Sequence, residues 1–321
     1  MITGYRDRMS SAHTPEEPPV ERTARLDATE VRDVLALARA AGDTDGADPL
    51  SEAVLLHLRH DAAADVVHLM LRDPDGALAG YGHIDAGDPS EGPWAELVVH
   101  PLRRRHGLGR RLVTAAVAAA TRLDPAGRLR VWAHGDHPSA GALALHLGFA
   151  RARVLLQLRR PLRLPLPDRP LPTGISLRPF RPGADDAAWL AVNSRAFATH
   201  PEQGRWTIDD LRVRMSEPWF DPAGFLLATD DATGRLLGFH WTKVHAGAAE
   251  SIGEVYVLGV DPDAHGRGLG TALTVAGLRH LHDRGLSQAM LYVDESNTPA
   301  VALYGRLGFA RWTADVNYRR G

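Results

Sequence analysis

Two glycine-rich segments have the residue types and the spacing that phosphate binding requires. The first is Arg104-Arg105-His106-Gly107-Leu108-Gly109, and the second is His265-Gly266-Arg267-Gly268-Leu269-Gly270. Each separates a predicted strand from a predicted helix, so the glycines let the backbone turn tightly and direct its amides outward. Those amides lie at the positive end of the helix and favour a phosphate or pyrophosphate ligand. Neither segment has the full dinucleotide fingerprint or the Gly-Lys-Ser/Thr ending of a nucleoside-triphosphate loop.

The sequences around the two segments also repeat, about 160 residues apart. Each segment follows a Val-x-Pro sequence, Val99-His100-Pro101 in the first copy and Val260-Asp261-Pro262 in the second. Downstream, Leu147-Gly148-Phe149 corresponds to Leu307-Gly308-Phe309. The chain therefore contains two copies of one nucleotide-binding unit.

The hydrophobic pattern predicts the same order of elements in both copies. The first has a helix from Asp27, strands at 66–71, 77–84 and 94–100, a helix to Leu123, a strand at 129–134, a helix at 139–147 and a terminal strand pair through Leu158. The second has a strand at 175–180, helices at 184–197 and 209–215, strands at 224–229, 236–244 and 254–260, a helix to Arg284, a strand at 288–293, a helix at 297–307 and a last strand pair. Alternating strands and helices predict an α/β (α+β) fold, a mixed central sheet flanked by helices in each half.

Composition changes along the chain predict its domain boundaries. Residues 1–18 are polar and aperiodic, and we expect a disordered leader. Residues 161–174 are rich in proline and have no helical period, which predicts an extended linker. The N-terminal domain is then 19–160 and the C-terminal domain is 175–321.

The series of strand, Val-x-Pro, Gly-x-Gly, helix, strand, helix and Leu-Gly-Phe resembles the GNAT family of acetyltransferases. The family's loop has Arg or Gln, two residues, Gly, any residue, and Gly or Ala. Arg104 to Gly109 matches this pattern, whereas the second loop has His265 at its first position. The resemblance implies two tandem GNAT domains with acetyl-CoA as cosubstrate, its pyrophosphate on the loop and its pantetheine arm along the preceding strand. We expect the histidine substitution to be minor, because backbone amides hold the pyrophosphate.

The resemblance also implies which residues contact acetyl-CoA. In the first copy they are Leu97, Val98, Val99, Arg105, His106, Gly107, Leu108, Gly109 and Arg110. In the second copy they are Leu258, Gly259, Val260, His265, Gly266, Arg267, Gly268, Leu269, Gly270, Thr271, Asn297, Thr298, Pro299, Ala300, Val301 and Ala302.

Two residues of the second copy are candidates for catalysis of acetyl transfer to an amine. An α-amine, with a pKa of about 8, is mostly protonated near neutrality and needs a base. Glu254 lies among apolar residues on a predicted strand, where burial would raise the pKa of its carboxyl group into a useful range. Tyr304 resembles the tyrosine that GNAT enzymes use to protonate the departing CoA thiolate. The alternatives are a solvent-facing glutamate and a tyrosine that only packs beneath its helix.

The first copy lacks both groups. Alignment on Leu-Gly-Phe places Ala144 opposite Tyr304, and alignment on Val-x-Pro places Pro93 opposite Glu254. Glu96 aligns three residues from the base position, and would therefore lie on the other strand face unless a bulge intervenes. We expect the N-terminal half to bind acetyl-CoA at most, and the C-terminal half to catalyse.

From His200 onward the chain resembles more closely a tandem-domain subgroup of the family from actinobacteria. The stretches concerned are 200–204, 240–245, 253–262 and 291–293. This resemblance implies transfer of acetyl to the cysteine amine of cysteinyl-glucosaminyl-inositol, the last step of mycothiol biosynthesis. It implies substrate contacts at Glu52, Glu202, Lys243, Glu254 and Tyr292. Lys243 is the only lysine among 37 lysine and arginine residues, either by chance or because the position needs a compact ammonium.

Two other interpretations stay open. The chain could acetylate another small amine or a protein N-terminus, although the segments around Glu202 and Lys243 argue against this. It could also be a CoA-sensing module without catalysis, although Glu254 and Tyr304 occur together in one copy.

Composition excludes several classes of function. The 321 residues include no cysteine, which excludes disulfides, zinc–thiolate sites and a thiol nucleophile. A net charge of −2 gives no general attraction to nucleic acid. Neither a membrane span nor a signal peptide is predicted, so we expect a cytoplasmic protein. We also expect the chain to be a monomer. The pairs His134 with His137 and His280 with His282 lack further ligands, and we expect no metal in the reaction.

Overall fold

The computed structural model describes residues 19–60, 66–87, 89–198, 200, 203–246 and 250–321. These residues form a single 12-stranded mixed sheet in the order β1-β2-β3-β4-β5-β12-β6-β11-β10-β9-β8-β7. Its strands are β1 (Glu21–Thr23), β2 (Val66–Arg72), β3 (Leu78–Asp85), β4 (Trp94–Val99), β5 (Leu129–Ala133), β6 (Ala150–Pro161), β7 (Ile175–Pro179), β8 (Phe225–Asp230), β9 (Leu236–His245), β10 (Ile252–Val260), β11 (Gln288–Asp294) and β12 (Ala310–Arg320). No helix within the described ranges is long and apolar enough to span a membrane.

Helices cover both faces of this sheet in each half. They are α1 (Ala28–Asp45), α2 (Glu52–His60), α3 (Leu108–Leu123), α4 (Pro138–His146), α5 (Asp186–Ala196), α6 (Ile208–Ser216), α7 (Leu269–Asp283) and α8 (Thr298–Arg306). In the N-terminal half, α1 and α2 pack on one face and α3 on the other. In the C-terminal half, α5 and α6 pack on the face that corresponds to that of α1 and α2, and α7 and α8 pack on the face that corresponds to that of α3. The repeat in the sequence is therefore a repeat in architecture.

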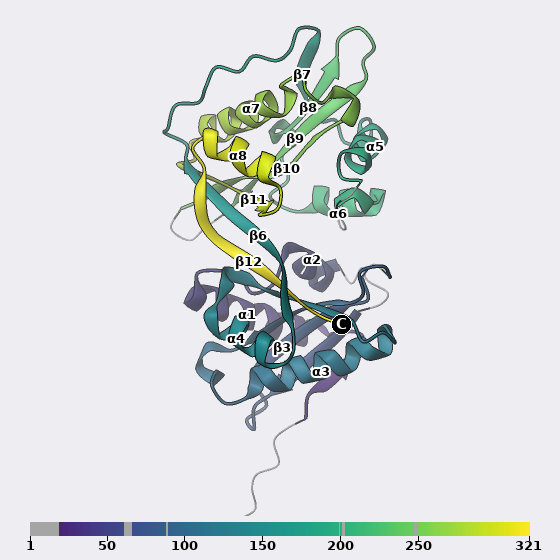
Figure 1. Cartoon of the computed structure of the whole chain (residues 1–321), viewed down its shortest axis with the longest axis vertical. Coiled ribbons are helices and arrows are strands. Elements are labelled where there is room, and N and C mark those ends of the chain that lie inside the picture. Colours follow the sequence, from purple (N-terminus) through teal and green to yellow (C-terminus); the bar gives the residue numbers. More distant parts are fainter. Residues whose placement is uncertain (1–18, 61–65, 88, 199, 201–202, 247–249) are drawn as a thin grey trace, which may run out of the picture.

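The two halves are joined by an exchange of their last strands. Figure 1 shows β6 and β12 as long strands that run together between the two lobes. The strand β12 pairs with β5 of the N-terminal half from Val316 to Arg320, and β6 pairs with β11 of the C-terminal half. The same two strands pair with each other in antiparallel orientation. Each half therefore contains the last strand of the other between strands of its own.

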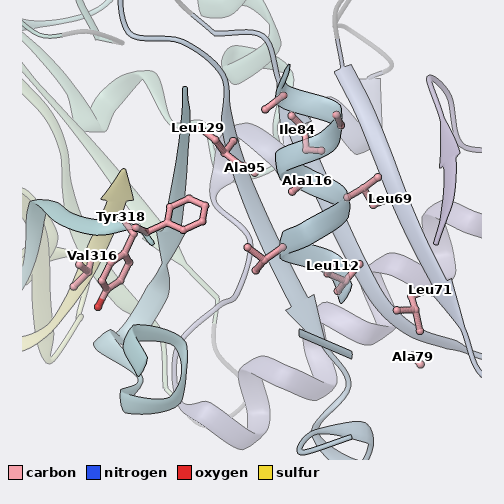
Figure 2. Close-up of a cluster of buried hydrophobic side chains, with 14 residues drawn as sticks. Leu69, Leu71, Ala79, Ile84, Ala95, Leu112, Ala116, Leu129, Val316 and Tyr318 are labelled. Carbon is pink, nitrogen blue, oxygen red and sulfur yellow. The ribbon is translucent and has the colours of Figure 1, made fainter. Parts of the chain in front are cut away.

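The hydrophobic cores contain the same exchange. Val316 and Tyr318 of β12 belong to the core beneath α3, together with Leu112 and Ala116 of that helix (Figure 2). Reciprocally, Leu156 and Leu158 of β6 belong to the core beneath α7. The prediction of a terminal strand pair in each half is thus wrong: each pair is one long strand whose partners come from both halves.

Other local predictions can be compared with the structure. Asp27 caps α1, since its carboxylate accepts hydrogen bonds from the amides of Thr29 and Glu30, and Glu30 bonds back to the amide of Asp27. The cap predicted at Asp27 is confirmed, whereas β1 and α2 were not predicted. Residues 162–174 contain no helix or strand, and Leu162, Leu166 and Leu171 pack on the C-terminal half. The leader at 1–18 lies outside the described residues.

Candidate active site

A V-shaped opening in the sheet occurs once in each half. The parallel strands β4 and β5 pair at Trp94, Ala95 and Glu96, and β10 and β11 pair only at Gly253 and Glu254. After Glu96 in β4 and after Glu254 in β10, the described residues show no further pairing of β4 with β5 or of β10 with β11, so the strands of each pair separate. The ends of β4 and β10 therefore present one edge with free backbone groups, which an extended chain can pair with.

The glycine-rich loops lie at the wide end of these openings. Gly107 and Gly268 are the N-cap residues of α3 and α7, with φ of 80° and 77°. This is the left-handed region, which only glycine adopts without strain. Neither helix has a side chain that caps its first amides, so those amides remain available to an anion.

The first position of each loop has a shared structural role. The Arg104 Nε donates a hydrogen bond to the carbonyl of Val99 at 3.2 Å, and the His265 Nε2 contacts the carbonyl of Val260 at 3.1 Å. Both side chains therefore tie the loop to the end of the preceding strand. The histidine substitution keeps this contact.

The acetyl-CoA contacts predicted after the loop of the C-terminal half lie at the start of α8. Asn297 caps this helix by accepting a hydrogen bond from the amide of Ala300, and 298–302 form its first turn. The predicted strand contacts Leu258, Gly259 and Val260 lie on the separated part of β10. These positions surround the opening between β10 and β11.

Glu254 lies at the apex of this opening. Its side chain is buried, and its Oε2 is 2.6 Å from Nε2 of His245. On the neighbouring strand β9, Lys243 is directly opposite Glu254. The alternative of a solvent-facing glutamate is therefore wrong.

The strand β10 contains a bulge beside this residue. Val255 pairs with Thr242 and Val257 with Trp241, so Tyr256 has no partner in the register. The bulge directs Tyr256 toward the aromatic cluster formed by Trp206, Trp219 and Trp241. A pattern of alternating residues cannot continue through such a bulge.

The bulge corrects the comparison between the two halves. Counted back from Val99 and Val260, both Trp94 and Glu254 stand in the sixth cross-strand pair. Trp94, not Pro93, is thus the counterpart of Glu254. The bulge also places Glu96 on the same face of the sheet as Glu254, which overturns the expectation that it lies on the other face.

Lys243 and Glu52 form a contact between the two halves. The Lys243 Nζ is 2.5 Å from Oε1 of Glu52, the first residue of α2, and the Tyr256 hydroxyl donates to Oε2 of Glu52 at 2.6 Å. The ammonium also lies 4.5 Å from the centre of the Trp219 ring. Burial alone would raise the pKa of Glu52, but Lys243 and the hydrogen bonds lower it below its ordinary value.

Tyr292 extends the site toward the N-terminal half. Its hydroxyl accepts a hydrogen bond from Nε2 of Gln157 at 2.7 Å, across the pairing of β11 with β6. The pKa of Tyr292 is raised, first by the poorly solvated surroundings of its hydroxyl and then by the negative charges of Glu254 and Asp315. Tyr292 therefore lies near Glu254, at the junction of the halves.

Tyr304 lies apart from this group. It packs in the core beneath α7 with Phe309, and burial raises its pKa to about 12. No hydrogen-bond partner of its hydroxyl lies among the described residues. Val255 of β10 belongs to the same core as Tyr304. Glu254 precedes Val255 in the strand, so its side chain points to the opposite face of the sheet. Tyr304 and Glu254 therefore approach the opening from opposite faces. The backbone confirms its alignment with Ala144, since Phe149 and Phe309 bond to the carbonyls of Ala144 and Tyr304.

The structure therefore brings together Glu52, Lys243, Glu254 and Tyr292, whereas Glu202 lies outside the described residues. Sequence reasoning missed three polar neighbours of this group, which are His245, Tyr256 and Gln157. His245 lies two residues after Lys243 on the same strand face, and period two could have found it. Tyr256 was hidden by the bulge, and Gln157 by the strand exchange.

The N-terminal half has a different arrangement at its own apex. The buried Glu96 accepts a hydrogen bond from the amide of Ser51 at 2.6 Å and lies 3.3 Å from Nε2 of His134. The other ring nitrogen of His134 is 3.0 Å from the carboxylate of Asp315 on β12. Burial would lower the pKa of His134, but the two carboxylates raise it to about 10. This apex is thus occupied by a charged cluster that includes a residue of the exchanged strand.

Comparisons with known proteins agree with this architecture. The sequence profile of the acetyltransferase (GNAT) family matches residues 33–149 and again 189–309. The chain is 64% identical over 308 residues to a mycothiol acetyltransferase of Salinispora arenicola, covering 95% of this chain and 98% of that protein. It is 54% identical to a mycothiol acetyltransferase of Streptomyces coelicolor, covering 94% of each.

Solved structures share the fold over most of the chain. A GCN5-related N-acetyltransferase from Sphaerobacter thermophilus superposes with a TM-score of 0.66 at 26% identity, covering 94% of this chain and 95% of that one. A tandem GNAT protein from the clavulanic acid pathway superposes with a TM-score of 0.70 at 22% identity, covering 94% and 98%.

Proposed function

Because the chain belongs to the acetyltransferase (GNAT) family, we propose that it transfers the acetyl group of acetyl-CoA to the cysteine amine of cysteinyl-glucosaminyl-inositol. Relatives up to 64% identical over nearly the full length are named mycothiol acetyltransferases, which supports this acceptor. The observation that carries the proposal is the buried Glu254 at the apex of the opening in the C-terminal half, directly across from Lys243.

In this proposal Glu254 acts as the general base. The acceptor amine loses a proton to its carboxylate, directly or through water, so that the nitrogen lone pair can attack the thioester carbon. The contact between Glu254 and His245 supports a route by which this proton continues to the half-exposed imidazole and then to solvent. After the C–N bond forms, the nitrogen gives up a second proton by the same route, and the C–S bond then breaks so that CoA leaves as a thiolate.

Tyr304 is proposed to protonate that thiolate. A buried tyrosine with a pKa of about 12 keeps its proton at neutral pH, so its hydroxyl can hydrogen-bond to the departing sulfur and pass on its proton as the C–S bond breaks, after which the phenolate regains a proton from solvent. Its position on the opposite face of the sheet from Glu254 fits two groups that act on the two sides of one reacting carbon. This role predicts that the hydroxyl reaches the sulfur when acetyl-CoA lies in the opening.

The acceptor is proposed to bind between the halves. Glu52 and Lys243 offer a carboxylate and an ammonium, and Tyr292 offers a hydroxyl, which suit a substrate with an amine and many hydroxyl groups. Glu202 is proposed as a further contact on the basis of sequence alone. The short bond between Glu52 and Lys243 would have to open or rearrange to admit the substrate.

The N-terminal half is proposed to bind acetyl-CoA without turnover. Its loop has the same left-handed glycine and uncapped helix as the other loop. Trp94 and Ala144, however, stand where the C-terminal half has Glu254 and Tyr304. Glu96 is already bound to His134 and Ser51, so it is not free to act as a base.

A matched pair of variants tests which half is catalytic. Gly107→Ala and Gly268→Ala introduce the same strain, since both glycines have φ near 80° and an added Cβ meets no atom within 4 Å. We expect Gly268→Ala to raise the KM for acetyl-CoA at least tenfold and Gly107→Ala to leave it unchanged. Equal effects, or a loss only in Gly107→Ala, would contradict the assignment.

The acceptor is tested by mass spectrometry of the acetylated product. The purified chain is incubated with acetyl-CoA and either cysteinyl-glucosaminyl-inositol or a panel of ordinary amines and peptide N-termini. N-acetylation of the pseudodisaccharide alone supports the proposal. Activity only on other amines would keep the family and remove this acceptor, and release of no CoA with any amine would favour a CoA-sensing module. We further propose that the enzyme is a monomer and acts in the cytoplasm, where acetyl-CoA is made, and light scattering would test the monomer.

A further inference from the structure

A second group of polar side chains lies in the N-terminal half, away from the proposed active site. It consists of His83 and Asp85 on β3 and His57 on α2. His83 and Asp85 are two residues apart and therefore share the sheet face that α2 covers. One potential ligand atom from each of the three side chains lies within 4.8 Å of the others. The group thus joins a helix to the sheet beneath it.

Three of the four ring nitrogens of this group are buried and lack hydrogen-bond partners among the described residues. His83 is 0% exposed, and neither its Nδ1 nor its Nε2 has a partner among the described residues. The Nδ1 of His57 is also buried without a partner. Native proteins rarely leave buried polar atoms unpaired, and three such nitrogens in one place require an explanation.

Neighbouring side chains do not supply the missing partners. The ring of His68 lies 5.7 Å from that of His83, but its Nδ1 bonds to the Tyr81 hydroxyl at 2.7 Å. The Trp94 ring lies 5.4 Å from that of His83, but Trp94 makes no hydrogen bond to either ring nitrogen of His83. The ring nitrogens of His83 are therefore left without a hydrogen-bond partner among the described residues. Burial, together with the nearby His57 and His68, lowers the pKa of His83 to about 3.

We propose that His57, His83 and Asp85 bind one divalent transition-metal ion, with Zn²⁺ as the best match. Two neutral imidazoles and one carboxylate are a typical donor set for zinc, and the fourth tetrahedral position stays open for water. Asp85 is already oriented, because one of its oxygens accepts a hydrogen bond from the amide of Gly87 at 2.6 Å. Mg²⁺ and Ca²⁺ prefer oxygen ligands and fit the site poorly.

The site would fix α2 to the sheet. This helix begins at Glu52, whose carboxylate contacts Lys243 and Tyr256 of the other half. His57 lies one and a half turns further along the same helix. A metal bound at His57 therefore holds the element that delivers Glu52 to the proposed active site.

Metal binding to the full-length chain, purified without a histidine tag and stripped with a chelator, tests the proposal. We expect one Zn²⁺ per chain by titration calorimetry and elemental analysis, and a rise in Tm with Zn²⁺ but not with Mg²⁺. Co²⁺ should give the intense visible absorption of a four-coordinate site. Failure to bind one equivalent of Zn²⁺ would overturn the proposal.

Variants of His57 and Asp85 can locate the ion while the fully buried His83 stays unchanged. His57→Ala and Asp85→Asn alter half-buried side chains, and each should weaken Zn²⁺ binding at least tenfold while the circular dichroism of the stripped protein stays unchanged. His146→Ala, at an exposed histidine, is the matched control and should bind as the unaltered chain does. Binding that is equally strong in all three variants would place the ion elsewhere and contradict the proposal.

Discussion

At the scale of single residues, the proposed active site contains several buried charged side chains. Glu254 and Lys243 face each other across two strands, and each has its own partner, His245 for the first and Glu52 for the second. Because both side chains are buried, removing either partner leaves a charge that water cannot solvate. Substitutions of Glu254 can therefore be tested by their effect on activity, and substitutions of Lys243 and Glu52 by their effect on the free energy of unfolding.

The first prediction concerns Glu254. Glu254→Gln keeps the size of the side chain but cannot accept the amine proton, so kcat should fall by about 10²-fold to 10⁴-fold. The KM for acetyl-CoA should change little, because the loop that is proposed to hold the pyrophosphate is untouched. Steady-state kinetics measure both quantities. A variant that keeps more than half of the original kcat would exclude Glu254 as the base.

The second prediction concerns the pair Glu52 and Lys243. Lys243→Met leaves a carboxylate facing an aromatic cluster and should lower the free energy of unfolding by about 3 kcal/mol. Glu52→Gln should cost less, since the amide oxygen of glutamine can still accept a hydrogen bond from the Lys243 ammonium. The double variant should be more stable than the sum of the single effects predicts. Denaturant unfolding of all four proteins measures this coupling, and simple additivity would mean that the contact contributes nothing.

Glu254 and Lys243 could be found from sequence because their type was unusual for their surroundings. A carboxylate in an apolar strand and a lone lysine both stand out. Tyr256 could not be found in this way, since a bulge changes which side chains share a face, and no residue type in β10 marks it. The same bulge caused the error at Pro93.

At the scale of secondary-structure elements, a cluster of charged side chains occupies the apex of the opening in the N-terminal half. His134 follows β5, Glu96 lies on β4 and Asp315 lies on β12, so three strands meet in this cluster. The histidine carries its proton at neutral pH and joins two carboxylates that would otherwise repel each other.

The third prediction follows from the pKa of His134. Since its value of about 10 in the folded chain exceeds that of an unfolded histidine, about 6.5, protonation stabilises the fold fully below pH 6.5. This contribution is lost as the pH rises through 10. The cost of His134→Gln should therefore be about 3 kcal/mol at pH 6 and shrink toward pH 10. Unfolding at several pH values, with His146→Gln as the control, measures this. A cost independent of pH would contradict it.

Most helices and strands could be predicted because their hydrophobic patterns are long or because capping residues and glycines mark their ends. Asp27 with Glu30 gives the start of α1, and the glycine-rich loops give the starts of α3 and α7. The helix α2 has nine residues with two histidines and an arginine, so its apolar stripe is too short for periodicity to detect. The three residues of β1 are shorter still.

At the scale of the whole molecule, the last strands bind the two halves into one sheet. Neither half has a complete sheet or core without a strand from the other, since β12 supplies Val316 and Tyr318 to the N-terminal core. The repeat was visible in the sequence, but this exchange was not. Pairing between residues so far apart in the chain leaves no local pattern, and a strand looks the same whichever half it joins.

The fourth prediction tests the exchange. A fragment of residues 19–161 lacks β12 between β5 and β6, and it should not unfold cooperatively. Joining residues 310–320 to its end through a short glycine and serine turn should restore cooperativity, because Ala310 lies opposite Arg159 in an antiparallel pair. Circular dichroism during thermal unfolding compares the two fragments. Cooperative unfolding of 19–161 alone would show that the N-terminal half does not need β12.

The position of β12 also determines when the protein can mature during synthesis. Domains usually fold in turn as they leave the ribosome, the N-terminal one first. Here the N-terminal half needs residues 310–320, which are translated after every helix and strand of the C-terminal half. Until then β5 and β6 lack the strand that lies between them. A ribosome that stalls between β6 and β12 therefore releases a chain in which the N-terminal sheet is unfinished, so folding of the N-terminal half depends on synthesis through residue 320.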